Sequence, residues 1–472
     1  MARVARCDDV GMSTWRTNVG DAIQTKLWPL PTAAVVIALL LGAGLPALDA
    51  AVGRELPPIV GQWLFGGDAG AARTLLAAIA SSLITVTALT FSLTVVTLQL
   101  ASSQFSPRLL RSFTSDQVVQ RTLALFLATF TFALTVLRSV RSAEGVQSEF
   151  VPTFAVTMAF LLAVASVVAL VLFLAHLTEL IRVEAMVRNV HQEASSTMES
   201  LLGERHPTDG DQRPTLRPPV SAVRLLVRGD GFVNRVDQQR LLRIAVDEDA
   251  MVRLDVHPGS FVVRGTPLGT AWPLAPGTLS TEVADRIADQ VAGCVRLGFE
   301  RTKSQDVGLG LRQLADVASK ALSPGINDPT TAVHTLGHIS SFLCDLTDRD
   351  LGPVVLHDED GRARVELDRP DLASYVDLGL SQPRRYGAGD PQLLAQIAQV
   401  LLDLSHRVAP DQRPVVRDHL ERLRATIHAQ PFDSAEQTSL AALVQRVEEG
   451  LGPPSAQPVA VESEPAAPRP AT

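Results

Sequence analysis

Apolar residues are concentrated in the first 180 positions of the chain, in four long stretches without Asp, Glu, Lys or Arg. These stretches cover residues 27–48, 74–107, 122–137 and 150–178. A helix needs about 20 mainly apolar residues to cross the hydrocarbon layer of a bilayer. The first, second and fourth stretches meet that length. The third, residues 122–137, is shorter and crosses only if its flanking arginines reach outward or the bilayer thins. The pattern predicts an α-helical polytopic membrane domain with about four transmembrane helices.

The basic residues around these stretches indicate how the helices are oriented. With four spans and the N-terminus inside, the inner segments carry nine Lys or Arg residues and the outer loops carry four. Short cytoplasmic loops of membrane proteins have such an excess of Lys and Arg. We therefore expect a multi-pass protein of the bacterial cytoplasmic (inner) membrane with both termini in the cytoplasm. Residues 1–26 form a cytoplasmic tail whose true start is Met1 or Met12.

The second stretch carries many hydroxyl groups for a helix that faces lipid. At about 100° per residue three serines, one threonine and Gln99 fall within about 40° of one another, and a group of threonines lies roughly opposite. Two interpretations are open: the stripe lines a water-filled path, or it packs against another helix, since small and hydroxylated residues favour close contact. No Asp, Glu, Lys or Arg lies within the four stretches, which argues against a proton-coupled pump. The stripe consists of Ser81, Thr85, Ser92, Gln99 and Ser103, and the opposite group of Thr87, Thr90, Thr94 and Thr97.

The second stretch ends at a proline near the cytoplasmic surface. Proline lacks a backbone donor and restricts the residue before it, so we expect the helix to break or bend there. The basic, amphipathic residues that follow lie at the lipid headgroups or dock on the soluble region. This membrane-exit motif consists of Gln104, Phe105, Ser106, Pro107 and Arg108.

The fourth stretch continues into a segment whose apolar stripe becomes polar. We expect one continuous helix from the membrane to about residue 202, which would couple the bilayer part mechanically to the soluble part. A polar, proline-rich segment then ends the helix. We assign residues 27–180 to the transmembrane domain and residues 181–219 to a connecting helix and linker.

Short segments separated by glycine and proline turns follow the linker. They predict a strand at residues 222–227, a helix at 237–246 and three short strands after it. Residues 258–268 resemble the small β-barrel of biotinyl and lipoyl carrier domains. Those carriers attach their cofactor to a lysine, and residues 220–302 contain none, which excludes a swinging-arm role. We assign residues 220–275 to a small β-rich domain with a barrel-like element and expect no cofactor.

The rest of the soluble region is mainly helical, which makes this region α+β overall. Residues 276–451 form the helical domain, and the tail at 452–472, rich in Pro, Ala and Glu, is expected to be disordered. Helices are expected at residues 281–297, 308–322, 390–405, 412–428 and 434–449, with a short hairpin at 356–368.

A sharp connection links the helix expected at residues 308–322 to a further helix that begins at Pro329. Pro324 and Gly325 suit a type II turn, Asp328 suits a helix cap, and Pro329 suits the first helical position. A capped corner explains this run fully. The other interpretation is a binding loop, because backbone donors at a helix start can hold an anion. The corner consists of Ser323, Pro324, Gly325, Asn327, Asp328 and Pro329.

His334 and His338 lie one turn apart on the helix after this corner. Two histidines at that spacing can share a metal ion, but a third ligand and the glutamate of a metalloprotease motif are missing. We interpret them as a solvent-facing or core-edge pair. The sequence contains no nucleophile elbow, phosphate loop, dinucleotide fingerprint or cysteine metal set. We therefore expect no metal site and no enzymatic activity.

Charge and cysteine content narrow the possible partners. A net charge of −8 provides no basic patch suited to nucleic acid. Three widely separated cysteines exclude a disulfide framework and fit a reducing compartment for the soluble part. Lysine occurs at only three positions, and such a bias towards arginine is typical of a GC-rich bacterial genome.

Two runs of the sequence resemble a known family. They are TALTFSLTVVTLQLASSQFSPRLLRSF at the second stretch and GLRQLADVASKALSPGINDPTTA around the corner. Both resemble bacterial predicted membrane proteins labelled domain of unknown function 2254, over a region from the first stretch to about residue 430. The resemblance implies the same architecture and location. That family has no established activity, so the resemblance implies no function.

The leading hypothesis is a channel or passive transporter for a small solute or ion, built as a homo-oligomer and gated by its cytoplasmic region. It rests on the uncharged, hydroxyl-rich second stretch and on the helical link behind the fourth. The alternative is a membrane-anchored sensor or scaffold that binds a cytoplasmic partner or ligand. In that case the polar stretch only packs the oligomer. In both hypotheses the partners include the lipid bilayer and exclude nucleic acid.

Overall fold

The computed structural model describes residues 28–52, 64–104, 116–141, 150–180, 182–205 and 217–452. At residues 50–52, 101–104 and 180 it describes the backbone alone. The chain forms two compact units, Met1–Met186 and Val187–Thr472, and each is described by itself.

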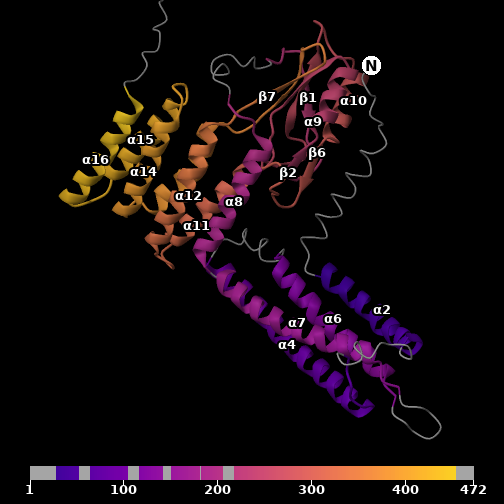
Figure 1. Ribbon diagram of the computed structural model, residues 1–472. Coiled ribbons are helices and arrows are strands. Elements are labelled where there is room, and N and C mark those ends of the chain that lie inside the picture. The colour runs from indigo at the N-terminus through magenta and orange to yellow at the C-terminus, as the bar shows by residue number, and fades with distance from the viewer. Residues whose placement is uncertain are drawn as a thin grey trace, which may run out of the picture. The chain divides into compact units, whose positions relative to one another are not determined.

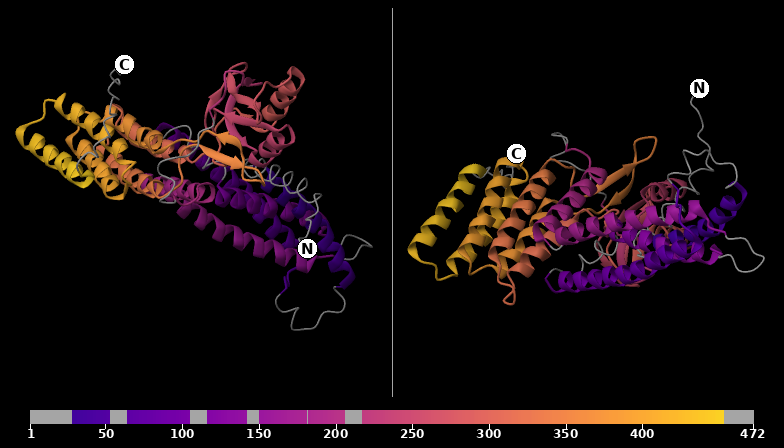
Figure 2. Two further views of the ribbon diagram at one scale, coloured as in Figure 1. Left: turned by 90° about the horizontal axis from the view of Figure 1, so that it is seen from above. Right: turned by 60° about the horizontal axis from the view of Figure 1, so that its bottom comes forward.

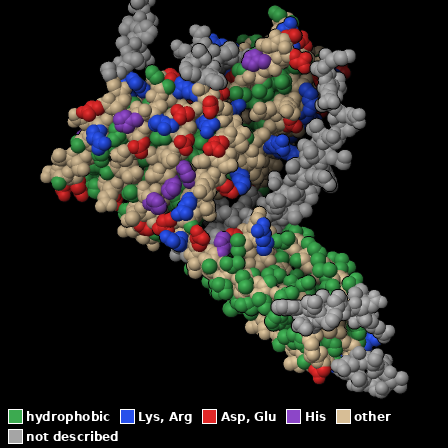
Figure 3. Space-filling model, viewed as in Figure 1, with side chains coloured by type: hydrophobic (Ala, Val, Ile, Leu, Met, Phe, Trp, Pro, Cys, Tyr) green, Lys and Arg blue, Asp and Glu red, His purple; other side chains and the backbone are tan. Residues whose placement is uncertain are grey.

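Four long helices form the first unit (Figure 1). Each contains a stretch long and apolar enough to cross a membrane, as the sequence predicts. Figure 3 shows hydrophobic side chains over most of the visible face of these helices, as expected for a surface in contact with lipid. The helices are α2 (Pro29–Val52), α4 (Ala69–Gln104), α6 (Gln117–Ser139) and α7 (Thr153–Leu180).

Helix α6 holds the membrane unit together. It packs against α2, α4 and α7, and it has the largest buried share of the four spans. Phe126, Phe132 and Val136 on this helix are fully or almost fully buried. Because its neighbours shield α6 from lipid, this helix needs less apolar surface than the others. That shielding explains why the third stretch looks too short in the sequence although the helix has 23 residues.

Two carboxylates cap helices at opposite ends of the membrane unit. Asp49, 6% exposed, accepts a 2.9 Å hydrogen bond from the amide of Phe154 in the first turn of α7. Asp116 accepts a 2.7 Å bond from the amide of Val118 at the start of α6 and contacts Nε2 of His176 at 2.7 Å. Unpaired amides at a helix start attract negative charge. The two carboxylates therefore fix how the helix ends meet.

The connection behind the fourth span differs from the prediction of one continuous helix. Helix α7 ends at Leu180, Arg182 is not helical, and α8 covers Val183–Leu201. The amide of Arg182 bonds to the carbonyl of Glu179, a tight contact typical of a helix end. The prediction of one continuous helix from the membrane to about residue 202 is therefore wrong.

Two small sheets follow α8 in the described part of the soluble unit. All neighbouring strands are antiparallel except β3 and β8, which are parallel. Both sheets are open within the described residues, so the barrel-like element is not confirmed. The larger sheet has the order β1 (Val223–Leu226), β5 (Pro267–Pro273), β3 (Ala250–Leu254), β8 (Ala363–Leu367) and β7 (Val354–His357). The smaller sheet has the order β4 (Phe261–Val262), β2 (Gly231–Val236) and β6 (Val295–Gly298).

Most of the predicted elements in this region occur, with three differences. Helix α9 (Gln238–Asp247) and the hairpin β7–β8 lie where the sequence predicts them. Helix α10 (Thr281–Ala292) is shorter than expected, because Gly293 caps it and strand β6 follows. Strands β2 and β6 were not predicted. Since β7 and β8 extend the larger sheet, the β-rich part is not confined to residues 220–275.

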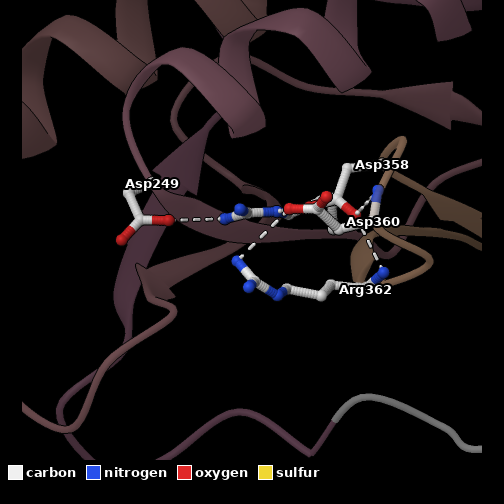
Figure 4. Close-up of polar contacts among 5 residues, drawn as sticks. Asp249, Asp358, Asp360 and Arg362 are labelled. Atoms are coloured by element: carbon white, nitrogen blue, oxygen red, sulfur yellow. Dashed lines mark hydrogen bonds and ion pairs between the residues drawn. The ribbon is translucent and has the colours of Figure 1, made fainter.

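A buried arginine anchors the hairpin β7–β8 to the rest of the sheet. Arg364 on β8 donates a 2.8 Å bond to Asp249, next to β3, and a 2.7 Å bond to Asp358 in the hairpin turn. Figure 4 shows these contacts with Arg362 and Asp360 beside them. The hydrogen bond from Arg364 holds the pKa of Asp358 below its ordinary value. This ion network joins segments more than one hundred residues apart in the sequence.

Six helices complete the soluble unit. Helices α11, α12, α14 and α16 pack successively side by side, and α13 and α15 pack against this row, as Figures 1 and 2 show. Helix α13 was not predicted. The bounds are α11 (Gly308–Ala321), α12 (Pro329–Thr347), α13 (Leu372–Tyr386), α14 (Pro391–Arg407), α15 (Arg413–His428) and α16 (Ser434–Leu451).

Close packing of α8 on α11 depends on Gly310. A Cβ atom at this position would lie 2.4 Å from Cβ of Ala194. We expect Gly310→Ala to lower the Tm of the full-length protein in detergent, because overpacking costs about 1–3 kcal/mol and exceeds the ~1 kcal/mol gain in helix propensity. Gly325→Ala is the control, since a Cβ there meets no atom within 4 Å. Equal Tm values for the two variants would contradict this packing.

Candidate functional site

The two polar groups of α4 lie on opposite faces of the helix, one buried in the membrane unit and one facing outward. Thr90, Thr94 and Thr97 are at most 8% exposed and face the other helices. Their hydroxyls donate to carbonyls four residues earlier in the same helix, for example Thr94 to Thr90 at 2.8 Å. Because these hydroxyls are satisfied locally, the side chains pack like small apolar ones. These three threonines therefore pack within the membrane unit.

The narrow stripe lies on the opposite, outward face of α4. Its described members are all exposed and occupy the middle of that face at about 100° per residue. Together with Ala88 and Val95 they follow alternating steps of four and three residues, the spacing of a helix–helix seam. The exposed members are Ser81, Thr85, Ser92 and Gln99.

Gln99 is the most polar member of this stripe. Its side chain forms no hydrogen bond with any residue that the structure describes, whereas the Thr85 hydroxyl donates to the carbonyl of Ser81 at 3.1 Å. The side chain of Ser103 is not described. Gln104 is the last residue of α4, and the remainder of the exit motif, residues 105–108, lies outside the described part.

The soluble corner is a capped turn, but not the predicted one. A type II turn requires a positive φ at Gly325, and φ is not positive there. Asn327 instead takes the left-handed conformation, with φ of 50°, and its amide bonds to the carbonyl of Ser323 at 2.9 Å. Asparagine tolerates this conformation because its short polar side chain bonds locally. The type II prediction is wrong, and the reversal at Asn327 replaces it.

The predicted cap after the corner is confirmed. Asp328 accepts a 3.1 Å hydrogen bond from the amide of Thr331, and Pro329 lies at the first position of α12. Hydrogen bonds from the hydroxyl and amide of Thr331 hold the pKa of Asp328 below its ordinary value. Asp328 thus uses the amides that an anion-binding loop would need. Capping explains the corner. Ile326, within the corner, is exposed.

The two histidines of α12 meet a third from α8. The ring of His338 lies 5.3 Å from that of His334 and 5.2 Å from that of His191, measured between centroids. Burial and these two neighbours lower the pKa of His338, so its imidazole is neutral near pH 7. The described residues contain no group of three His, Cys, Asp or Glu side chains arranged to hold a metal ion. The sequence does not reveal His191 as a neighbour, because no regular spacing links it to α12.

A cavity of about 290 Å³ lies where the strands of the soluble unit meet its helices. Arg301 and Asp306 form a paired contact at its wall, with distances of 2.7 and 2.9 Å. Gly259, with φ of 94°, lets the strand turn approach this pair, since a Cβ there would lie 2.6 Å from the Asp306 carboxylate. Tyr375 closes the other side and is 4% exposed, and burial raises the pKa of its hydroxyl.

Apolar side chains form most of the remaining wall of this junction cavity. They come from the end of α8, both sheets, the segment after β3, the start of α11 and α13. A mainly apolar pocket with a few converging polar groups is the usual form of a small-molecule site. The sequence did not indicate it, because its walls come from segments far apart in the chain. Its apolar residues include Leu202, Val236, Val256, Val307, Leu367 and Leu378.

Comparison with known proteins places the chain in a family. The sequence model of the family described as Predicted membrane protein (DUF2254) matches residues 24–403. The chain belongs to this family. The chain is also similar to uncharacterised proteins of Mycobacterium bovis and Mycobacterium tuberculosis, each 35% identical over 404 residues, which cover 84% of this chain and 76% of the relative. No solved structure matches the chain.

The DUF2254 match contains the features described above. Residues 24–403 include all four spans, the corner and the junction cavity, and the match ends within α14. The match thus ends before residue 430, the approximate limit that the sequence resemblance predicts. The family assignment supports a membrane protein of bacterial origin and leaves its activity open.

Loss of the cap at the corner provides a test of its structural role. We expect Asp328→Ala to lower the free energy of unfolding at pH 7 by about 1 kcal/mol, the usual cost of losing a helix cap. Because the folded-state pKa is lowered, the contribution is present above the unfolded pKa of about 4 and is lost as pH falls through the folded value. The stability difference between wild type and variant should therefore shrink in acid. Full stability of Asp328→Ala at pH 7 would contradict the cap.

Proposed function

We propose that the protein is a homo-oligomeric channel or passive transporter of the bacterial cytoplasmic membrane, with both termini in the cytoplasm. In this proposal the α4 helices of neighbouring copies bring their outward stripes together beside a path for a small solute or ion. The cytoplasmic region regulates this path. The protein carries out no covalent chemistry.

The outward stripe of α4 is the observation that carries this proposal. Lipid offers no hydrogen bonds, so a helix gains little by placing Ser92 and Gln99 at the centre of a lipid-facing surface. The alternating four-and-three spacing of the stripe is the pattern with which a second helix packs closely. The occupant that this face fits is therefore α4 of another copy.

The chemistry of the stripe supports passive movement. It offers hydroxyl and amide dipoles, and no Asp, Glu, Lys or Arg lies on α4 between Arg73 and its end at Gln104. Ionisable groups inside a membrane usually serve proton relays or voltage sensing. A path lined by neutral dipoles can conduct a solute or ion down its gradient without coupling to protons. Water in such a path would also satisfy the amide of Gln99.

Cysteine crosslinking tests the contact between copies. In a variant whose three native cysteines are replaced by serine, we expect Ser92→Cys to form disulfide-linked dimers under mild oxidation in membranes. Phe91→Cys is the matched control, because Phe91 is also exposed on α4 but points about 80° or more away from the stripe. Dimers at position 91 and none at 92 would contradict the proposed seam.

Flux through liposomes tests the path itself. We expect Gln99→Leu to reduce ion or small-solute flux at least about tenfold, because loss of one desolvated polar contact of about 1.4 kcal/mol corresponds to that factor. Leu89→Ala, an exposed change off the stripe, should leave flux unchanged. Equal flux through wild type and Gln99→Leu, with equal folding, would contradict the role of Gln99.

A membrane-anchored sensor is the second candidate, favoured by the junction cavity. Its volume of about 290 Å³ and mainly apolar wall suit a small, largely apolar ligand. We expect a small molecule to co-purify with the full-length protein in native mass spectrometry and to be lost in Val256→Trp, which fills the cavity. Val246→Trp, at a surface position outside the cavity, is the control. A ligand retained by Val256→Trp would contradict the cavity as its site.

A further inference from the structure

A second cavity, of about 280 Å³, opens among helices α11, α13 and α15 of the soluble unit. Its wall is polar and rich in arginine, unlike that of the junction cavity. Four arginines and one aspartate line it. We refer to it as the arginine pocket, and its polar residues are Arg312, Asp377, Ser381, Gln382, Arg384, Arg385 and Arg422.

Helix α13 supplies most of this wall from one face. Asp377, Ser381 and Arg384 follow one another at steps of four and three residues, so they lie within about 60° on the helix. Arg312 comes from α11 and Arg422 from α15, and both helices pack against α13. The pocket is therefore built by tertiary packing. It was not predicted, because α13 itself was not.

Two of the four arginines have a carboxylate partner. Arg422 contacts Asp377 at 3.0 Å and Asp418 at 2.7 Å, and Arg312 contacts Asp316 at 3.0 Å. Arg384 and Arg385 form no ion pair with any residue that the structure describes. Positive charge at this pocket is thus only partly balanced by the chain.

Arg384 has one buried donor without a partner. Its Nη1 donates to the carbonyl of Arg422 and to the hydroxyl of Thr426, while its Nε is buried and has no hydrogen-bond partner. Burial and the neighbouring Arg385 and Arg422 lower the pKa of Arg384. A partly buried cation beside other cations is unfavourable unless an anion accompanies it.

Helix capping alone does not explain this arrangement. Arg384 and Arg385 lie in the last turn of α13, where positive charge interacts favourably with the helix end. That effect requires neither the approach of Arg312 and Arg422 from other helices nor a buried Nε without a partner. The arrangement fits an external anion that bonds several guanidinium groups at once.

We propose that the arginine pocket binds a phosphate-bearing ligand. Guanidinium groups donate two parallel hydrogen bonds to phosphate oxygens, and several of them together can neutralise more than one charge. The pocket is slightly smaller than the 300–1,000 Å³ typical of drug-sized ligands, so it takes the phosphate or diphosphate part of a ligand. That part can belong to a soluble phosphorylated molecule or to a lipid headgroup. This inference does not depend on the proposed channel.

Calorimetry with pyrophosphate tests the site in the full-length protein, reconstituted in phosphatidylcholine nanodiscs at about 0.15 M salt, where long-range charge effects are screened. We expect one pyrophosphate to bind per chain, with inorganic phosphate binding more weakly. Arg384→Gln and Arg385→Gln should each weaken the affinity for pyrophosphate at least about tenfold, as expected for loss of a charge-assisted hydrogen bond.

Two controls keep the test decisive. Arg385 is exposed, so Arg385→Gln should fold even if Arg384→Gln does not. Arg362→Gln removes an exposed arginine on the hairpin β7–β8, outside the pocket, and should leave the affinity unchanged. No heat of binding with pyrophosphate, or equal affinities in Arg385→Gln, Arg362→Gln and wild type, would overturn the proposal.

Nanodiscs that contain phosphatidylglycerol distinguish the two sources of the phosphate group. If the ligand is a soluble molecule, pyrophosphate should bind wild type equally well in both kinds of disc. If a lipid headgroup occupies the pocket, phosphatidylglycerol should compete and weaken pyrophosphate binding to wild type. Either result supports a phosphate site and identifies its natural ligand class.

Discussion

The hydrocarbon layer of the membrane is the constraint on which the first unit depends. Every backbone amide and carbonyl within that layer must be bonded internally, which is why the apolar stretches form complete helices. Packing around α6 then decides which surfaces meet lipid. Its buried phenylalanines fix the position of α4, and the position of α4 turns the threonines inward and the serine–glutamine stripe outward. The direction of this stripe is therefore a consequence of core packing, and the proposed contact between copies follows from it.

In the soluble unit, polar contacts join segments that are distant in the chain. Arg364 links β8 to Asp249 and to the hairpin turn, and this ion network helps to hold β8 beside β3 in the larger sheet. Arg301 and Asp306 are only five residues apart, and Gly259 packs closely against this pair, which brings a strand turn next to the start of α11. Gly259, Arg301 and Asp306 all lie in the wall of the junction cavity. The cavity is thus a product of long-range contacts between sheet and helices.

The sequence predicts the membrane helices well, because a long apolar stretch has few other stable structures. It also predicts the cap at Asp328, since a cap depends on neighbours in the sequence. It does not predict the break at Arg182, because the apolar stripe continues from α7 into α8 across the helix end. It misses β2, β6 and α13, whose short or mixed patterns gain their structure from the elements that pack on them. The outward direction of Ser92, the contact of His191 with His338 and the arginine pocket all depend on tertiary packing, which periodicity does not contain.

Water accessibility along α4 is the measurement that tests the account most directly. Single cysteines at positions 91 and 92, in a chain without other cysteines, would be exposed to a membrane-impermeant thiol reagent in intact membranes. If the stripe borders a path for solute, the cysteine at position 92 should react and the one at position 91, facing lipid, should not. Equal protection of both positions would contradict a water-filled path and leave the stripe with a packing role alone.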